Sequence, residues 1–472
     1  MKEKFLKDLG IYGISTLLVR LINFLLIPVY ARVLSQDEYG AMDLINTLTY
    51  VTGVFLFLEM YQAVSRYYAE ANDDQRKKIV GTGLSHYLIS MLPLLIVVWL
   101  IKDQLAMWLV GSRDDGNMVL LAFGSAMAMA VFNYLQTVRR YALESAAYAL
   151  ASIACVLTTV LVSIVLVVYA KQGLSGVFLG QLVGAAIGLV VSMQGHYKAS
   201  MVSIDWKMWK ELIRFSAPLT VSAVLLYLMN YIDRWLIRDH LGLAAVGIYA
   251  VVFRIAAVPM LVMNIVSNSL LPHIYREYKD RQKAVEIGRL YNLIWSAGLL
   301  LVAWMAWLSP EVVLWMAGDV YSMHAYLFPI VLLSGFLLHY SYLFVGLYLG
   351  HKTHLTAYLY LAGLAAVYLL NTILLPRYGL AGTAISSILT TGGILVFQYF
   401  ASQKAFTFPI QLRSMLVNGG FTILPILVAF YLGYHQKLPG IGLRLFIAVI
   451  TSSILLYPLR GELAMAWNRL RS

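Results

Sequence analysis

Apolar runs of 20 or more residues follow one another along this chain from end to end. A helix needs about 20 apolar residues to cross the hydrocarbon core of a bilayer, and a spanning helix satisfies its backbone hydrogen bonds internally. Of the 472 residues, 61% are hydrophobic and 12% are charged, whereas about 25% are charged in a typical soluble chain. The sequence therefore predicts an all-α, polytopic integral membrane protein and excludes an ordinary cytosolic enzyme.

Charged residues and Gly, Pro or Asn punctuation divide the chain into about 14 predicted transmembrane helices. The first run continues from Leu9 to Val33, which is too long for the apolar core of a cleavable signal, about 7 to 15 residues. We therefore expect it to stay in the membrane as the first helix. The predicted spans lie near 10 to 33, 41 to 65, 79 to 101, 117 to 138, 142 to 169, 174 to 196, 212 to 236, 243 to 270, 288 to 308, 324 to 349, 354 to 375, 380 to 402, 412 to 433 and 441 to 459.

The basic residues alternate between the two sides that this count defines. One side holds 24 of the 35 lysines and arginines, and the other side holds seven. Cytoplasmic loops of membrane proteins carry the excess of positive charge. We therefore predict a multi-pass protein of the bacterial inner membrane with both termini in the cytoplasm.

The two halves of the chain resemble each other at a nearly constant offset. At an offset of 207, Asn23 falls on Asn230; at 206, the segment GLSG (173 to 176) falls on GLAG (379 to 382). Because an even number of spans separates the copies, they have the same orientation in the membrane. Parallel repeats with a site between them are typical of alternating-access transporters.

The repeat predicts three parts. Residues 1–205 form an N-terminal lobe of six helices, residues 206–403 form a second lobe of six, and residues 404–472 add the last two helices.

Several ionisable residues lie within the predicted spans, where a charge costs at least a few kcal/mol unless it faces the bundle interior. Arg20 of the first helix and Arg254 of the eighth have no carboxylate three or four residues away. We interpret both as cations of a central cavity, and Arg234 of the seventh helix is a third candidate.

The candidate cavity acids are Glu59, Asp43 and Asp233. Two of them have a structural alternative, since Arg66 shares a helical face with Glu59, and Asp233 and Arg234 could belong to structural ion pairs between helices. The uncharged polar residues that share these helical faces are Asn23, Asn46, Gln62 and Asn230.

No motif for catalysis accompanies these residues. The sequence has no Walker-type phosphate loop, HExxH or GxSxG, and a single cysteine, Cys155, cannot form an internal disulfide or a cysteine metal site. The formal net charge of +12 is explained by topology and anionic lipid. We therefore predict no enzymatic activity, no cofactor, no metal site and no nucleic-acid partner.

Four segments resemble a known family. They are ARVLSQDEYG in the first loop, SRYYAE at the end of the second helix, GIYAVVFRIAAVPMLVMNIVSNSLLPHIYREY from the eighth helix onward, and YGLAGTAISSILTTG at the twelfth. Together they are similar to bacterial polysaccharide flippases, which share a superfamily with multidrug and toxic compound extruders and the lipid II flippase. The resemblance covers essentially the whole chain.

This resemblance implies the fold and the function. The fold would be a V-shaped pair of six-helix lobes, with a cationic cavity for the diphosphate and acidic sugars and a lipid-facing groove for the polyprenyl tail. The cargo would be an undecaprenyl-diphosphate-linked oligosaccharide repeat unit for lipopolysaccharide or a related polymer, moved from the cytoplasmic to the periplasmic leaflet. Arg20, Glu59 and Arg254 match charged cavity positions of the lipid II branch, and Asp43 matches more loosely. Membrane lipids, and a polysaccharide polymerase or chain-length protein, are the expected partners.

Arginine suits such a cargo because its fork of donors matches phosphate oxygens and stays charged. A proton or sodium gradient is the expected energy source, with Glu59 or Asp43 as the coupling residue. Three alternatives stay open: a multidrug extruder that exchanges cations for drugs, a lipid II-type flippase, and a membrane scaffold for a glycosyltransferase or polymerase. The deep arginines favour an anionic cargo over a cationic drug.

Overall fold

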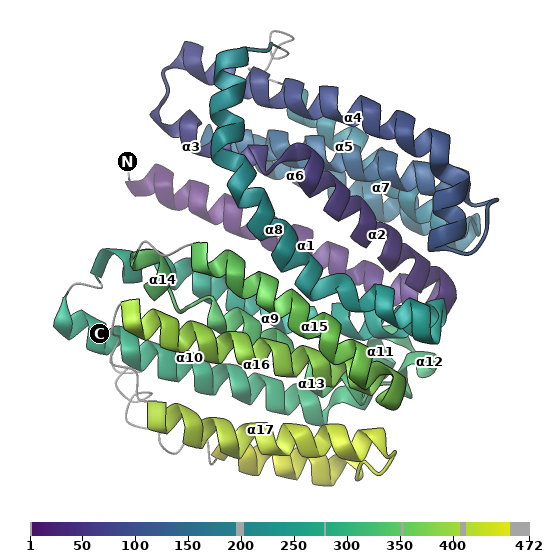
Figure 1. Cartoon of the computed structure of the whole chain (residues 1–472), viewed down its shortest axis with the longest axis vertical. Coiled ribbons are helices and arrows are strands. Elements are labelled where there is room, and N and C mark those ends of the chain that lie inside the picture. Colours follow the sequence, from purple (N-terminus) through teal and green to yellow (C-terminus); the bar gives the residue numbers. More distant parts are fainter. Residues whose placement is uncertain (1, 195–202, 278–279, 351–353, 406–411, 454–472) are drawn as a thin grey trace. The chain divides into compact units, whose positions relative to one another are not determined.

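The computed structural model describes residues 2–194, 203–277, 280–350, 354–405 and 412–453, which are helical almost throughout, with no strand among them (Figure 1). Contacts divide the chain into two compact units, Met1–Trp235 and Leu236–Ser472. The lobe boundaries at 205/206 and 403/404 follow the sequence repeat and stay predictions.

Unit 1 consists of α1 to α7, a short π-helix η1 and most of α8. Their bounds are α1 Lys2–Val33, α2 Gln36–Phe57, α3 Met60–Glu70, α4 Asp73–Leu109, α5 Gly116–Tyr141, α6 Ser145–Ile164, η1 Val165–Tyr169, α7 Gly173–Met193 and α8 Trp206–Leu241.

Unit 2 begins near the end of α8. Its helices are α9 Leu243–Glu277, α10 Arg281–Trp307, α11 Ser309–Ala317, α12 Asp319–Ser322, α13 Leu327–Ser341, α14 Gly346–Leu349, α15 His354–Tyr378, α16 Leu380–Ala405 and α17 Leu412–Tyr434, followed by a helix over Ile441–Ser453.

Twelve helices in the described ranges are long and apolar enough to cross a membrane, judged by length and composition. Two shorter apolar helices, α13 and Ile441–Ser453, fall within two more of the predicted spans. The prediction of an all-α polytopic membrane protein is thereby confirmed. The last parts of two predicted spans, 195–196 and 454–459, lie outside the described residues.

The outer faces of the helices carry apolar side chains, as a lipid environment requires. On α4, Ile89, Leu92, Ile96 and Leu100 recur at helical spacing, and each is more than half exposed. The opposite side of this helix packs into the core of unit 1, where Leu84 and Tyr87 are buried. Helix α4 therefore separates a lipid-facing stripe from a packed interior.

The motif LSQDEYG marks the start of α2 through a capping box. The Glu38 amide donates to the Ser35 hydroxyl at 3.2 Å, and the Ser35 amide donates to the Glu38 carboxylate at 2.8 Å. Such a box satisfies two amides that would otherwise lack partners. The charged loop after the first span is thus explained in part by helix initiation.

A second cap starts α8. The Asp205 carboxylate accepts from the amides of Lys207 and Met208, at 3.0 and 3.1 Å. Hydrogen bonds from amide groups favour the charged form, and the Met208 amide is the largest cause that lowers the pKa of Asp205.

The sequence repeat has a counterpart in the backbone of the two units. Gly173 is the first residue of α7, and Gly379 immediately precedes α16; their φ angles are +52° and +57°. Left-handed backbone of this kind is readily adopted by glycine and rarely by other residues. The aligned segments GLSG and GLAG therefore begin their helices with the same unusual conformation.

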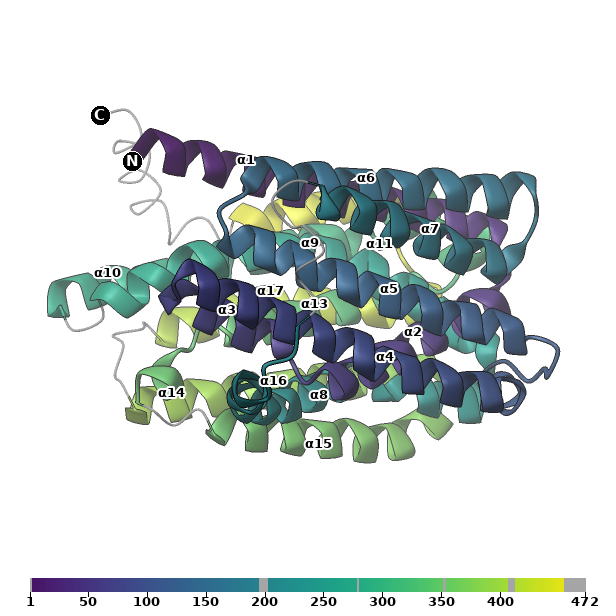
Figure 2. The ribbon, with the colours of Figure 1, turned by 90° about the horizontal axis from the view of Figure 1, so that it is seen from above.

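Helices α5, α6 and α7 lie side by side in unit 1 (Figure 2). A Cβ on Gly184 would lie 1.9 Å from the Thr159 hydroxyl, and one on Gly188 would lie 2.8 Å from the Cβ of Cys155. Small residues at this spacing let membrane helices approach closely.

One long apolar run is divided into α5 and α6 by a turn, and Arg139, near the end of α5, stabilises this turn. Its guanidinium is 2% exposed and donates to the Glu144 carboxylate at 3.0 Å and to the Gln194 carbonyl at 2.9 Å. Arg139 therefore ties the α5–α6 turn to the end of α7.

In unit 2, the helix Ile441–Ser453 is attached to the preceding helices by polar contacts. Arg444 donates to the Trp307 carbonyl at 3.0 Å and to the Glu311 carboxylate at 2.9 Å. Trp304 donates to the Ser452 hydroxyl at 2.7 Å. The last two helices are thereby packed as an addition onto α10 and α11.

Candidate functional site

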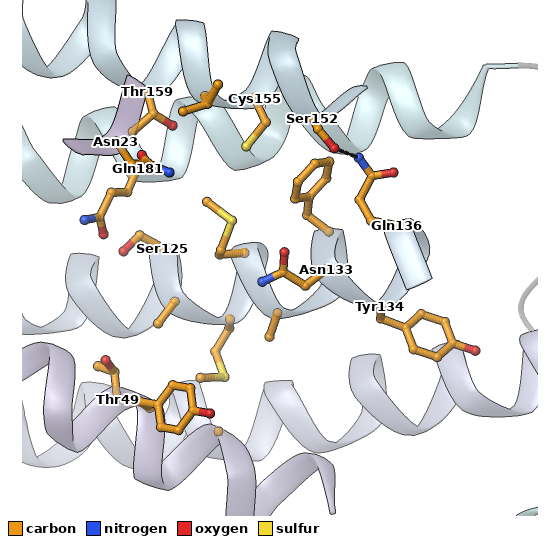
Figure 3. Close-up of a pocket in the computed structure, with 18 of the residues that line it drawn as sticks. Asn23, Thr49, Ser125, Asn133, Tyr134, Gln136, Ser152, Cys155, Thr159 and Gln181 are labelled. Carbon is orange, nitrogen blue, oxygen red and sulfur yellow. Dashed lines mark hydrogen bonds between the residues drawn. The ribbon is translucent and has the colours of Figure 1, made fainter. Parts of the chain in front are cut away.

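A cavity of about 860 Å³ lies within unit 1. Ligand pockets typically measure roughly 300–1,000 Å³, so this cavity is large enough for a ligand of several rings. Side chains from α1, α2, α3, α4, α5, α6, α7 and α8 line it. Figure 3 shows part of this lining, with amides and hydroxyls from separate helices around the open space.

Arg20 lines the cavity from α1, and it is exposed there. Within the described ranges no carboxylate lies within ion-pairing distance of its guanidinium. Thr16 and Asn23 also line the cavity, at the spacings that place them on the same face of α1. Helix α1 therefore presents an open cation, flanked by uncharged polar groups, to the cavity.

Glu59 lies at a break that the sequence did not predict. The predicted span from 41 to 65 was continuous, whereas the structure ends α2 at Phe57 and begins α3 at Met60. Leu58 and Glu59 both adopt left-handed backbone, with φ of 49° and 51°. Non-glycine residues pay roughly 1–2 kcal/mol each for this conformation, so the break is a strained feature of the cavity wall.

The Glu59 side chain is 7% exposed and lines the cavity. Gln62 donates a short hydrogen bond to its carboxylate, and Tyr61 makes a second side-chain hydrogen bond to it. Arg66, the partner suggested by the sequence, instead has its guanidinium 4.6 Å from the Phe215 ring centroid. In the described part of the chain, Glu59 is thus a buried acid held by neutral groups.

Tyrosines cover the wall between α2 and α8. The rings of Tyr50 and Tyr227 are stacked at 4.0 Å, and Tyr227 stacks on Tyr231 at 4.4 Å. Tyr50 is half-exposed and lines the cavity together with Tyr227. An aromatic face next to hydroxyls is thereby available to a ligand.

Two lining residues that sequence reasoning missed are Asn133 of α5 and Gln181 of α7 (Figure 3). Gln181 is a lone amide within the apolar stretch LGQLV, and that isolation was the available signal. Asn133 shares a face of α5 with Gln136 and Thr137, three and four positions further on, and this polar face was its signal. Asn46 of α2, which was predicted, also lines the cavity.

Asp43, Asp233 and Arg234 form a separate cluster, which we call the buried ion cluster. Arg234 donates to Asp233 at 2.5 Å, and its Nε lies 3.5 Å from an Asp43 oxygen. The three are 4%, 3% and 1% exposed. None of them is among the described residues that line the cavity.

The remaining predicted residues lie near these two sites or in unit 2. Asn230 donates to the Leu226 carbonyl at 2.7 Å, and its own carbonyl accepts from Arg234 at 2.8 Å. Arg254 is half-buried on α9 of unit 2. The structure therefore brings Arg20, Asn23, Asn46 and Glu59 to one cavity and assigns Asp43, Asp233 and Arg234 to the buried ion cluster.

The charge of the cavity wall is low. Among the described residues that line it, only Arg20 and Glu59 carry a charge, and these have opposite signs. In the described ranges no three His, Cys, Asp or Glu side chains are grouped to hold a metal ion. The chemistry that this wall offers is hydrogen bonding, aromatic contact, one cation and one carboxylate.

This chain is similar to known proteins in sequence and in fold. The family profile described as "Polysaccharide biosynthesis protein" matches residues 5–277. "Lsg locus putative protein 1" of Haemophilus influenzae is 21% identical over 85% of this chain and 98% of that protein. "Putative O-antigen transporter" of Shigella flexneri is 21% identical over 79% of this chain and 91% of that protein.

Solved structures show the same fold at low identity. An inward closed structure of the lipid II flippase MurJ covers 96% of this chain and 99% of its own, with a TM-score of 0.70 and 12% identity. An inward-facing multidrug resistance MATE family transporter covers 82% of this chain and 95% of its own, with a TM-score of 0.64 and 14% identity.

Proposed function

Because the chain belongs to the polysaccharide biosynthesis protein family, as its loop and helix-end motifs led us to expect, we propose that it is a flippase for lipid-linked sugars. Its cargo would be an undecaprenyl-diphosphate-linked oligosaccharide repeat unit. It would move this cargo from the cytoplasmic to the periplasmic leaflet of the inner membrane by alternating access. The protein acts as a transporter rather than as an enzyme.

The observation that carries the proposal is the position of Arg20. It is a cation without a carboxylate partner in the described ranges, at the wall of a large cavity inside a membrane bundle. An ionisable residue within a membrane span that faces the bundle interior or a water-filled cavity commonly marks a substrate pathway. A diphosphate supplies several oxygens that accept charge-assisted hydrogen bonds from the guanidinium. We assign the diphosphate to Arg20. Arg254, on α9 of unit 2, stays a proposed substrate-binding cation of that unit.

Glu59 is the proposed coupling residue. It is buried, its described partners are neutral, and it occupies the strained break between α2 and α3. Taking up a proton or a sodium ion would remove the cost of keeping a lone carboxylate out of water. The ion would thereby change the balance between conformations in which Glu59 is more or less solvated. Asp43, by contrast, already interacts with Arg234.

The orientation and the partners follow from the same proposal. We propose that both termini lie in the cytoplasm, and the excess of basic residues on one side supports this orientation. A flippase delivers its cargo to the periplasmic leaflet, where a polysaccharide polymerase or chain-length protein would use it.

The proposal is tested in the native host. Deletion of the gene should cause sugar-loaded undecaprenyl diphosphate to accumulate, and a membrane-impermeant lectin or oxidant should fail to reach it. The wild-type gene should restore the normal distribution, whereas Arg20→Ala, present at the same level, should not. Loss of dye efflux without such accumulation would instead indicate a multidrug extruder, and accumulation of lipid II would indicate a lipid II-type flippase.

A further inference from the structure

Four amide side chains on four helices line the cavity with their hydrogen-bonding groups unused. They are Asn23 of α1, Asn46 of α2, Asn133 of α5 and Gln181 of α7. Within the described residues, none of these side chains makes a hydrogen bond or other polar contact. Each amide carries two N–H donors and an acceptor oxygen. Together they leave considerable hydrogen-bonding capacity facing the cavity.

Three hydroxyl groups of the same wall, unlike these amides, are already hydrogen-bonded within the protein. Thr49, Ser125 and Thr137 donate to backbone carbonyls of their own helices, at 3.0, 2.8 and 3.0 Å. Gln136 also differs, since its amide nitrogen donates to the Ser152 hydroxyl at 2.8 Å (Figure 3). These contacts stabilise the helices. The four amides make no such contact, so their N–H donors and carbonyl oxygens can form hydrogen bonds with a ligand.

The position of the charges narrows the class of ligand. Among the described lining residues of α5, α6 and α7, none is charged; Arg20 lies on α1 and Glu59 at the α2–α3 break. A wall that bound acidic sugars would need further cations to replace the water lost by each carboxylate. Sugar hydroxyls and acetamido groups are both donors and acceptors, as the amides are, and they are uncharged.

We propose that Asn23, Asn46, Asn133 and Gln181 bind the sugar part of the cargo and that the sugar rings at this wall are uncharged. This inference rests on the proposed flippase function and adds the class of sugar that the cavity accepts. Tyr50, half-exposed beside Asn46 on α2, offers an aromatic face to the apolar side of a sugar ring.

The test uses the purified full-length protein in proteoliposomes and two matched probes. Both are undecaprenyl diphosphate carrying a fluorescent trisaccharide; in one all three sugars are neutral, and in the other a hexuronic acid replaces one hexose. Flipping of each probe is measured as the fraction of its fluorescence that an external quencher can no longer reach. The wild type should flip the neutral probe at least about tenfold faster, because an unpaired buried charge is costly.

Variants link the preference to the wall. Asn133→Leu and Gln181→Leu should each slow flipping of the neutral probe by roughly three- to tenfold, as expected for the loss of hydrogen bonds to a neutral group. Gln194→Leu is the matched control, since Gln194 is an exposed amide at the end of α7 that does not line the cavity. Asn133→Arg should shift the preference toward the acidic probe.

The outcomes separate this inference from the proposed function. Equal flipping rates of the two probes, or an unchanged rate in Asn133→Leu and Gln181→Leu, would contradict the proposal that this wall binds uncharged sugars. The proposed flippase function would not be affected by either result. Failure of folded wild-type protein to flip either probe would overturn both. Thermal unfolding of each variant shows whether a slow variant is still folded.

Discussion

The cavity wall and the buried ion cluster of unit 1 both contain arginine and acid, yet they use them in opposite ways. In the cluster, Arg234 is 1% exposed and lies within 3.5 Å of two carboxylates. In the cavity, Arg20 is exposed and has no carboxylate partner in the described ranges. The cluster satisfies its charge internally, whereas the cavity leaves its charge for something that enters.

The difference shows how to interpret an ionisable residue inside a membrane. Removing one member of a buried ion pair leaves the other charged and without compensation. Removing an open cation leaves the protein intact but takes a contact from the ligand. Stability and transport should therefore respond to different arginines.

The largest expected effect comes from breaking the buried ion cluster. Arg234→Met leaves Asp43 and Asp233 buried without their shared cation, which should cost about 3–5 kcal/mol of stability. Thermal unfolding in detergent would show this as a lower Tm. The triple variant Arg234→Met/Asp43→Asn/Asp233→Asn should recover much of the lost stability. An unchanged Tm in the single variant would mean that Arg234 does not stabilise the fold.

Removal of the open cation should affect transport instead. Arg20→Ala should slow flipping of a lipid-linked sugar by roughly ten- to 150-fold, because hydrogen bonds to a charged group contribute about 1.5–3 kcal/mol. Its Tm should stay close to that of wild type, and Arg20→Lys should retain part of the activity. Arg66→Ala is the control, since Arg66 lies against Phe215. A large drop in Tm for Arg20→Ala would erase the contrast between the two regions.

Glu59 is the cavity acid on which coupling should depend. Glu59→Gln keeps the size of the side chain but cannot gain or lose a proton at neutral pH. Flipping without a gradient should stay within roughly threefold of wild type, about the value of one neutral hydrogen bond. Acceleration by an imposed proton or sodium gradient should disappear. If the gradient still accelerated the variant, Glu59 would not be the coupling residue.

The smallest effect is expected at an exposed ion pair. Lys77 and Asp74 lie 3.6 Å apart with side chains 76% and 92% exposed. Such pairs contribute about 0–1 kcal/mol, so Lys77→Ala should leave both Tm and flipping nearly unchanged. A substantial loss of stability here would mean that exposure does not separate the two kinds of charge in this protein.

The fold was largely predictable because membrane helices follow from continuous apolar length alone. The break at Leu58 and Glu59 was not, since neither residue is a glycine or proline and tertiary packing overrides local preference there. The apolar pattern continues through the break, so hydropathy cannot detect it.

The candidate site was predictable only in part. Asn23 and Asn46 follow from helical periodicity around Arg20 and Asp43. The pairing of Arg234 with Asp43 joins residues far apart in the chain, and the sequence shows only neighbours three or four positions away. Asn133 and Gln181 line one cavity because α5 and α7 pack beside each other, and the sequence does not show this packing.

The most direct test of the central claim is flipping of a fluorescent undecaprenyl-diphosphate-linked sugar by purified protein in proteoliposomes, with wild type and Arg20→Ala compared at equal amounts and equal Tm. Our account predicts that the wild type moves the lipid between leaflets and that Arg20→Ala is at least about tenfold slower. Equal rates in the two proteins would contradict the assignment of the cargo diphosphate to the open arginine of the cavity.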